Sequence, residues 1–155
     1  MAEEQNLVSV SVERLTKRQY HRAFAHDTRT TLPGYVDAER VHQNRTPVAY
    51  TRPDQLLEQV QAARWARYHK GETQRAPQSL RKDGVLAVSG IMTFSHTAQA
   101  IIQALPAQEQ DRLYRQAADA VAAQFNTHVV GLVVHADEQA PHAHFVLPGF
   151  DDAGR

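Results

Sequence analysis

The chain lacks cysteine, long apolar runs and any net charge. Without cysteine, both disulfide bonds and a thiolate zinc site are excluded. No apolar run approaches the roughly 18 residues that a membrane-spanning helix needs, and residues 1–4 do not have the pattern of a signal peptide. We therefore expect a soluble, cytoplasmic protein. Its 155 residues are enough for one domain with a core of its own.

The overall neutrality hides an uneven distribution of charge. Residues 1–82 carry 14 Lys or Arg against 9 Asp or Glu, a net charge of +5. Residues 83–155 carry 3 against 8, a net charge of −5. This asymmetry allows an anion-binding surface on a protein whose total charge is zero.

Three histidines and two carboxylates follow the short apolar run at 129–134; they are His135, Asp137, Glu138, His142 and His144. The β-branched run predicts a buried strand, and residues 142–147 predict a second one. Alternation along a strand puts His142 and His144 on one face. If the two strands form a hairpin, His135 lies beside them, and three imidazoles then suit a divalent metal with open coordination positions. The alternative is a surface hairpin whose histidines are merely polar.

The remaining pattern predicts a mixed fold. Strands are expected at 7–12 and 84–94, with residues 30–52 irregular. Helices are expected over the basic segment 14–25, from Asp54 as the N-cap residue to about Tyr68, at 97–104 and at 106–125. The glycines of the segment 84–94 indicate a bulge or a close approach. This order favours an α/β two-layer sandwich with a largely antiparallel sheet. Its helices would pack on one face and the histidines would lie on the other.

A basic segment with aromatic residues runs from residue 64 to residue 82. Its cations are Arg64, Arg67, Lys70, Arg75, Arg81 and Lys82, and only Glu72 opposes them. Together with Trp65 and Tyr68, they suit contact with the backbone and bases of single-stranded nucleic acid. The alternative is a solvated helix end whose aromatic side chains turn into the core.

Four segments together resemble the plasmid mobilisation relaxases of the MobV, or Pre/Mob, family. The most specific is His135-x-Asp-Glu-x-x-Pro-His142-x-His144, which is similar to the third motif of that family. Residues 23–29, with His26 three positions before Arg29, look like its first motif. Residues 40–44 resemble its Arg-x-His-x-Asn stretch, although Arg45 stands where an aromatic residue is usual, and residues 79–85 resemble the basic run before its middle strand.

The resemblance spans about residues 7–155 and implies a metal-dependent endonuclease that nicks one DNA strand at a plasmid origin of transfer. By this resemblance His135, His142 and His144 would bind Mn²⁺ or Mg²⁺, with Zn²⁺ as a competitor. His26 would be the nucleophile that stays joined to the 5′ phosphate. Glu138 would orient or deprotonate it, and Arg29 would contact phosphate.

The implied partner is single-stranded or hairpin plasmid DNA, contacted by Asn44 and by the basic residues Arg64, Arg67, Lys70, Arg81 and Lys82. Residues 1–155 would form one relaxase domain without the further C-terminal region of the family, on which dimerisation and membrane association would depend.

Two other interpretations remain open. A replication initiator of the same superfamily would use a tyrosine, either Tyr114 or Tyr20, in place of His26. A non-catalytic, metal-stabilised DNA-binding module would use the metal site without nicking DNA. A metalloprotease is excluded, because the sequence has no His-Glu-x-x-His.

Overall fold

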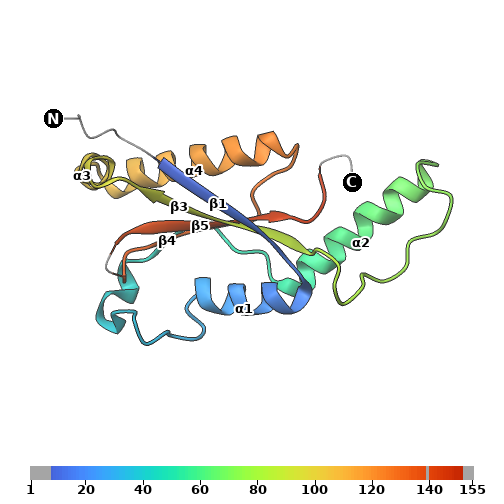
Figure 1. The fold of residues 1–155 in the computed structure, drawn as a ribbon, viewed down its shortest axis with the longest axis horizontal. Coiled ribbons are helices and arrows are strands. Elements are labelled where there is room, and N and C mark those ends of the chain that lie inside the picture. Colours follow the sequence, from blue (N-terminus) through green and yellow to red (C-terminus); the bar gives the residue numbers. More distant parts are fainter. Residues whose placement is uncertain (1–7, 139, 152–155) are drawn as a thin grey trace.

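A computed structural model describes residues 8–138 and 140–151. Its elements, in chain order, are β1 (Val8–Leu15), α1 (Lys17–Asp27), the 3₁₀ helix η1 (Ala38–Gln43), β2 (Arg45–Val48), α2 (Pro53–His69), β3 (Ala87–Phe94), α3 (His96–Gln103), α4 (Ala107–Gln124), β4 (Gly131–His135) and β5 (His142–Pro148). The expected mixed α/β class is confirmed (Figure 1).

The five strands form one antiparallel sheet in the order β1-β3-β5-β4-β2. The β4–β5 hairpin pairs His135 directly with His142 and Val133 with His144. The expected hairpin is therefore present, and its histidines lie in the interior of the sheet rather than on an edge strand.

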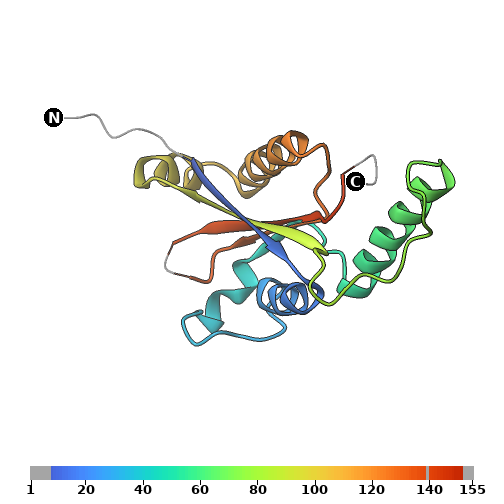
Figure 2. The same ribbon diagram turned by 45° about the vertical axis from the view of Figure 1, so that its right-hand side comes forward.

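The helices cover both faces of the sheet, whereas the sequence led us to expect them on one face only. Figures 1 and 2 show α3 and α4 on one side and α1, with the first turns of α2, on the other. In β5, Phe145 packs with Tyr114 of α4, while Val146 packs with Tyr20 of α1 and Leu56 of α2. Both faces of the central strands are apolar, so both need a cover.

The histidines consequently share a face with α1. His144 and Val146 have the same strand parity, and Val146 belongs to the core cluster that contains Tyr20. The C-terminal end of α1, where His26 lies, is thereby brought over the histidine cluster. This arrangement, and not a histidine face without helices, defines the site.

Gly90 is required by close packing inside the sheet. It pairs with Phe145 of β5, and a Cβ atom added at Gly90 would lie 2.1 Å from the ring. The ring thus occupies the space that a side chain at position 90 would need. The expected close approach is confirmed here, although β3 itself begins at Ala87 and not at Gly84.

Two local expectations were wrong. Helix α2 begins at Pro53 with Arg52 as its N-cap residue, so Asp54 lies in the first turn and is not the cap. The segment 30–52, expected to be irregular, contains η1 and the edge strand β2. Residue 7 of the first expected strand lies outside the described residues. Among those described, no helix is both long and apolar enough to cross a membrane.

Candidate active site

Three imidazoles converge on the β4–β5 hairpin. Each of His135, His142 and His144 offers a ring nitrogen, and these atoms all lie within 4.8 Å of one another. His135 is fully buried, and the side chains of His142 and His144 are about 15% and 13% exposed. The cluster is therefore rigidly held by two paired strands and is open to solvent on one side.

Hydrogen bonds turn the ring nitrogens in the way that metal binding requires. His135 donates from Nε2 to the carbonyl oxygen of Asp27 at 2.8 Å, and His142 donates from Nδ1 to the carbonyl oxygen of Ala140 at 2.9 Å. The opposite nitrogens, His135 Nδ1 and His142 Nε2, then carry lone pairs. Such contacts from the second ring nitrogen are usual for metal-bound histidine.

Two ring nitrogens of the three histidines are buried without a hydrogen-bond partner in the described part of the chain. Within the described residues, His135 Nδ1 and His144 Nε2 have no hydrogen-bond partner. Buried polar atoms are rarely left unpaired, because desolvation then has no compensation. The residues present therefore fit a divalent cation held by His135, His142 and His144.

Burial, together with the neighbouring His142 and Arg29, lowers the pKa of His135 to about 4 and that of His144 to about 2. A neutral imidazole is the form that binds a metal. His135 and His144 accordingly stay neutral, and able to bind a cation, below neutral pH.

Glu138 lies beside the imidazoles and not beside His26 alone. Its Oε2 atom is 3.1 Å from His142 Nε2, 3.6 Å from His135 Nδ1 and 2.9 Å from Arg29 Nη2. No hydrogen bond joins it to His26 within the described part of the chain. Its carboxylate is thus positioned to balance the charge of a cation bound by the histidines.

Arg29 is occupied by internal contacts. Its guanidinium binds both carboxylate oxygens of Asp137 at 2.8 Å and donates from Nη1 to the carbonyl oxygen of His26. Asn44 adds two hydrogen bonds to these contacts: its side-chain amide donates to Asp137 and accepts from the backbone N–H of Ala136. Arg29 and Asn44, both considered as DNA contacts from the sequence, fasten the end of α1 and the η1–β2 junction to the hairpin.

His26 faces the three clustered histidines from the end of α1. Its ring centroid is 6.4 Å from that of His135 and 6.3 Å from that of His144. Partial burial, together with the nearby Arg29, lowers the pKa of His26 and favours its neutral form. The proposed nucleophile and the proposed metal ligands, more than a hundred residues apart in sequence, therefore share one site.

Two further residues belong to this site that were not expected from the sequence, Asp27 and Tyr35. Besides accepting from His135, Asp27 has a carboxylate oxygen 3.7 Å from His144 Nδ1, and it accepts a hydrogen bond from Tyr50. Burial raises the pKa of Asp27 to about 6. Tyr35 is 64% exposed, and its hydroxyl is 3.2 Å from His26 Nε2. In the sequence, only the position next to His26 indicated a role for Asp27. Nothing in the segment 30–52 indicated a role for Tyr35.

Comparison with known families decides what kind of protein carries this site. The family model described as "Mob_Pre: Plasmid recombination enzyme" matches residues 5–155. The chain belongs to the Mob/Pre family. The resemblance carried by the histidine motif is thereby confirmed, although no curated protein matches the chain.

Solved structures of Mob/Pre relaxase domains have the same fold. A Mn-bound crystal structure of the MobM relaxase domain with 22-nucleotide oriT DNA of plasmid pMV158 is 19% identical, with a TM-score of 0.68 over 94% of this chain and 72% of that one. Another, with 23-nucleotide DNA, is 22% identical and has a TM-score of 0.65 over 96% and 71%. A third contains 26-nucleotide oriT DNA, at 19% identity and a TM-score of 0.61.

Neither tyrosine considered from the sequence reaches the site of this Mob/Pre chain. Tyr114 is buried in the core on the α4 face and packs against Phe94. Tyr20 is fully buried in the other core cluster, and its hydroxyl donates to the carbonyl oxygen of Thr51. Burial also raises the pKa of both hydroxyls.

The basic residues of the 64–82 segment lie elsewhere and do not line the histidine site. Arg64, Arg67 and Arg81 line a separate cleft beside α2, whereas Lys70 and Lys82 are exposed and are not among its lining residues. Trp65 is exposed and stacks on His69 of its own helix at a centroid distance of 5.7 Å. Trp65 does not line that cleft, but it lines a neighbouring hollow together with Pro77, Gln78 and Ser79, which line the cleft as well.

Proposed function

We propose that this Mob/Pre protein is a metal-dependent relaxase that nicks one strand of plasmid DNA at an origin of transfer, with His26 as the nucleophile. One observation carries the proposal: His26, whose lowered pKa favours the neutral ring, faces three histidines whose ring nitrogens converge, and two of those nitrogens have no hydrogen-bond partner within the described residues. Because its substrate is plasmid DNA, we expect it to act in the cytoplasm.

The metal would be held by His135, His142 and His144, with Glu138 beside it. Bound there, a divalent ion supplies Lewis-acid polarisation of the scissile phosphate and stabilises charge in its transition state. Mn²⁺ accepts imidazole ligands more readily than Mg²⁺ does, and Zn²⁺ competes for such a donor set. The Mn²⁺ ion in the MobM crystals supports the choice of Mn²⁺.

His26 performs the covalent step. A ring nitrogen forms a bond to phosphorus, the bond from phosphorus to O3′ breaks, and the 5′ phosphate remains on His26 as a phosphoramidate. The imidazole loses one proton overall and O3′ gains one, so the step balances without an outside reagent. The lowered pKa of His26 supports this role, because only the neutral ring has a nucleophilic lone pair.

The surrounding polar residues position these groups. Arg29 fixes the end of α1 through Asp137 and through the carbonyl oxygen of His26 itself. The carbonyl oxygen of Asp27 faces His135 Nε2, and its carboxylate faces His144 Nδ1. Asp27 thereby favours the tautomers in which His135 Nδ1 and His144 Nε2 carry the lone pairs. We therefore assign Arg29 and Asp27 to positioning; any contact of Arg29 with phosphate adds to that role.

A tyrosine nucleophile is the second candidate, and one contact favours it. The exposed hydroxyl of Tyr35 lies 3.2 Å from His26 Nε2, so the imidazole is in place to accept its proton. In that case the covalent product would be a tyrosyl phosphodiester. The same contact also orients His26 in the first mechanism.

Transfer of a label from DNA to the protein tests the proposal. Purified protein is incubated with a library of single-stranded oligonucleotides, carrying the label at either the 3′ or the 5′ end, with Mn²⁺ or with EDTA. We expect a labelled protein band with the 3′ label and Mn²⁺ only, because the protein keeps the downstream fragment. DNA binding without transfer in any lane would indicate a non-catalytic, metal-stabilised binding module instead.

A further inference from the structure

The two edge strands of the sheet, β1 and β2, differ in how they are protected against further pairing. β2 has four residues, one of which is Pro47, and its register against β4 is irregular. A short strand, a proline and an irregular register all hinder the addition of another strand. β1 has eight residues and an unbroken register against β3, with neither proline nor lysine in it. The outer edge of β1 is therefore a suitable template for a further strand.

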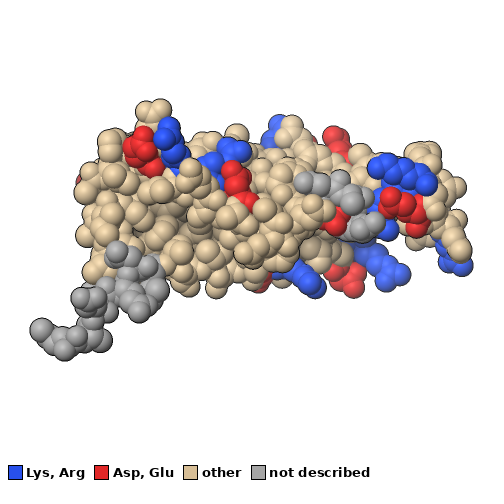
Figure 3. Space-filling view, turned by 90° about the horizontal axis from the view of Figure 1, so that it is seen from above, with Lys and Arg blue, Asp and Glu red and all other residues tan. Residues whose placement is uncertain are grey.

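β1 is exposed over nearly its whole length. Val8, Val10 and Val12 are 54%, 37% and 47% exposed. They lie on the face of the sheet that α4 covers elsewhere, because Val10 pairs with Met92, a residue of the core cluster beneath α4. Figure 3, seen from the side of α3 and α4, shows a broad uncharged area on this face. Three valines along one edge strand are thus left facing solvent.

The sequence of the exposed part of β1 is a palindrome, Val8-Ser9-Val10-Ser11-Val12. If two copies of this strand pair antiparallel about Val10, each valine lies opposite a valine on one face and each serine lies opposite a serine on the other. Both are favourable cross-strand pairs. Moving the register by one residue places valine opposite serine, and moving it by two residues toward Leu15 places Ser9 opposite Glu13. The register about Val10 therefore matches all five residues.

This register is symmetric. The two-fold axis passes beside Val10, perpendicular to the sheet, so each copy contributes the same residues to the contact. Such a contact uses the exposed edge of both copies and leaves only the two protected β2 edges. The assembly therefore closes with two copies and does not continue into a fibre.

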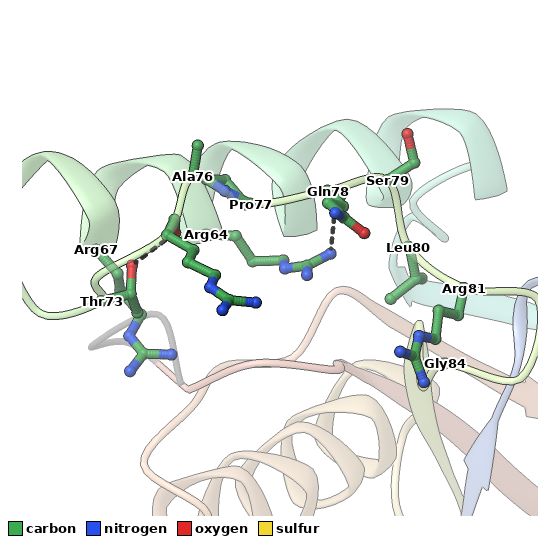
Figure 4. Close-up of a pocket in the computed structure, with 11 residues that line it drawn as sticks. Arg64, Arg67, Thr73, Ala76, Pro77, Gln78, Ser79, Leu80, Arg81 and Gly84 are labelled. Carbon is green, nitrogen blue, oxygen red and sulfur yellow. Dashed lines mark hydrogen bonds between the residues drawn. The ribbon is translucent and has the colours of Figure 1, made fainter.

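The rest of the molecule is compatible with this pairing. Helix α1 and the start of α2 lie at the Leu15 end of β1, away from Val8 (Figures 1 and 2). Leu80, which packs against the core cluster of Leu15, also lines the cleft beside α2. We call this the arginine cleft, after the side chains that Figure 4 shows along it, Arg64, Arg67 and Arg81. Antiparallel pairing points the two Leu15 ends in opposite directions, so the like-charged clefts of the two copies stay apart.

We propose that two copies of this chain associate through β1, with residues 8–12 of each copy paired about Val10. The result is one continuous antiparallel sheet with five strands from each copy. This contact needs neither metal nor DNA, and it does not involve the C-terminal region to which the family resemblance assigns dimerisation. Five residue pairs bury much less than the roughly 1,200–2,000 Å² of a standard interface. The dimer is therefore weak and depends on protein concentration.

The pairing would place both histidine sites on the same side of the joined sheet. His144 pairs with Ile91, and Ile91 pairs with Ser11, so the site lies level with the two-fold axis on the serine face. Strands β3 and β1 of each copy separate the two β5 strands, which puts them roughly 24 Å apart. If the proposed relaxase function holds, the dimer presents two nicking centres to DNA on one side. This consequence alone rests on that function.

Sedimentation of the metal-free protein without DNA tests the proposal. From about 10 µM to about 1 mM, the mean mass should rise from that of one chain toward that of two. Val10→Lys places two like charges opposite each other at the axis and should raise the dissociation constant about tenfold or more. The matched control is Ile101→Lys, an exposed apolar position on α3, which should associate like the unmodified protein.

Three results would overturn the proposal: a single chain at every concentration, association that Val10→Lys leaves unchanged, or an equal loss in both lysine variants. Open-ended growth beyond two copies would also contradict the symmetric register. Val10→Lys should still transfer label from DNA, because β1 contributes no residue to the histidine site. Failure of label transfer in the unmodified protein would thus count against the relaxase function and leave the β1 contact standing.

A cysteine cross-link tests the register without adding charge. The chain has no cysteine of its own, so a disulfide can form only at an introduced position. Val10→Cys should form a disulfide-linked dimer under mild oxidation, because residues directly opposite in an antiparallel pair are close enough for one. Ile101→Cys, far from the axis, should give only traces of dimer. Equal cross-linking in the two variants would place any association elsewhere on the molecule and overturn the proposal.

Discussion

The guanidinium of Arg29 holds both carboxylate oxygens of Asp137, a residue 108 positions further along the chain. The side chain of Arg29 is 5% exposed and that of Asp137 is fully buried. Arg29 itself adopts a left-handed backbone conformation, with φ of 58°, directly after Thr28, the C-cap residue of α1. The pair thus fastens a strained helix end to the metal-binding hairpin.

Arg29→Ala should therefore destabilise the whole fold. It leaves the carboxylate of Asp137 buried and uncompensated, which costs about 3–5 kcal/mol. Urea unfolding in EDTA measures the loss. The control is Arg115→Ala, whose pair with Asp119 is half exposed and is worth about 0–1 kcal/mol. If Arg29→Ala and Arg115→Ala were equally stable, Arg29 would not stabilise the fold, and only the expected contact with phosphate would remain for it.

Removal of two imidazoles should abolish metal binding and leave the fold intact. His142→Ala with His144→Ala should bind Mn²⁺ at least a hundredfold more weakly by calorimetry, because one histidine cannot hold the ion alone. The control is His21→Ala with His69→Ala, two exposed positions. The metal-free protein should keep its circular dichroism, since two core clusters hold it together. Unfolding on chelation would make the metal structural.

The metal-free protein should lose stability in acid because of its buried histidines. The unfolded chain takes up protons near pH 6.5, whereas the folded pKa values are about 4 for His135 and about 2 for His144, so stability falls as pH drops below 6.5. Asp27 acts in the opposite sense, because its folded pKa of about 6 lies above its ordinary 3.8.

Between pH 6 and 4 these three groups leave a net uptake of one proton on unfolding, or about 1.4 kcal/mol per pH unit. His144→Gln should remove most of that slope when the free energy of unfolding is followed by urea titration in EDTA. A slope that is unchanged in His144→Gln would show that His144 titrates normally in the folded protein.

Loss of the Tyr35 hydroxyl should slow the reaction without stopping it. Tyr35→Phe removes one contact to His26, worth about 0.5–1.5 kcal/mol, so label transfer should slow about two- to thirteenfold. Its Mn²⁺ affinity should stay unchanged, since Tyr35 does not contact the three histidines. Complete loss of transfer would instead make Tyr35 the nucleophile.

The β4–β5 hairpin with its three histidines could be predicted from the sequence, because the features that determine it are local. Strand alternation puts His142 and His144 on one face, and a short connection brings His135 opposite His142. Family resemblance linked His26 to this cluster, but local periodicity had no means of doing so. That link depends on α1 crossing the sheet, and the ion pair of Arg29 with Asp137 fixes it.

What could not be predicted depends on tertiary packing. The two-sided cover of the sheet arises because Phe145 and Val146, adjacent in β5, are both buried. A run of apolar residues gives burial but not the number of covering layers. The positive charge of the segment 64–82 could likewise be read from the sequence, but the placement of its side chains could not. Trp65 stacks on His69 of its own helix and does not line the arginine cleft.

The chemistry of the protein–DNA bond tests the central claim most directly. Label transfer is carried out with the unmodified protein, His26→Ala and Tyr35→Phe, and each adduct is split between acid and neutral buffer. We predict an adduct that is lost in acid, is absent from His26→Ala and persists in Tyr35→Phe, because phosphoramidates hydrolyse in acid and tyrosyl phosphodiesters do not. His26→Ala should still bind Mn²⁺ with nearly unchanged affinity. An acid-stable adduct, or one that survives His26→Ala, would contradict the assignment of His26 as the nucleophile.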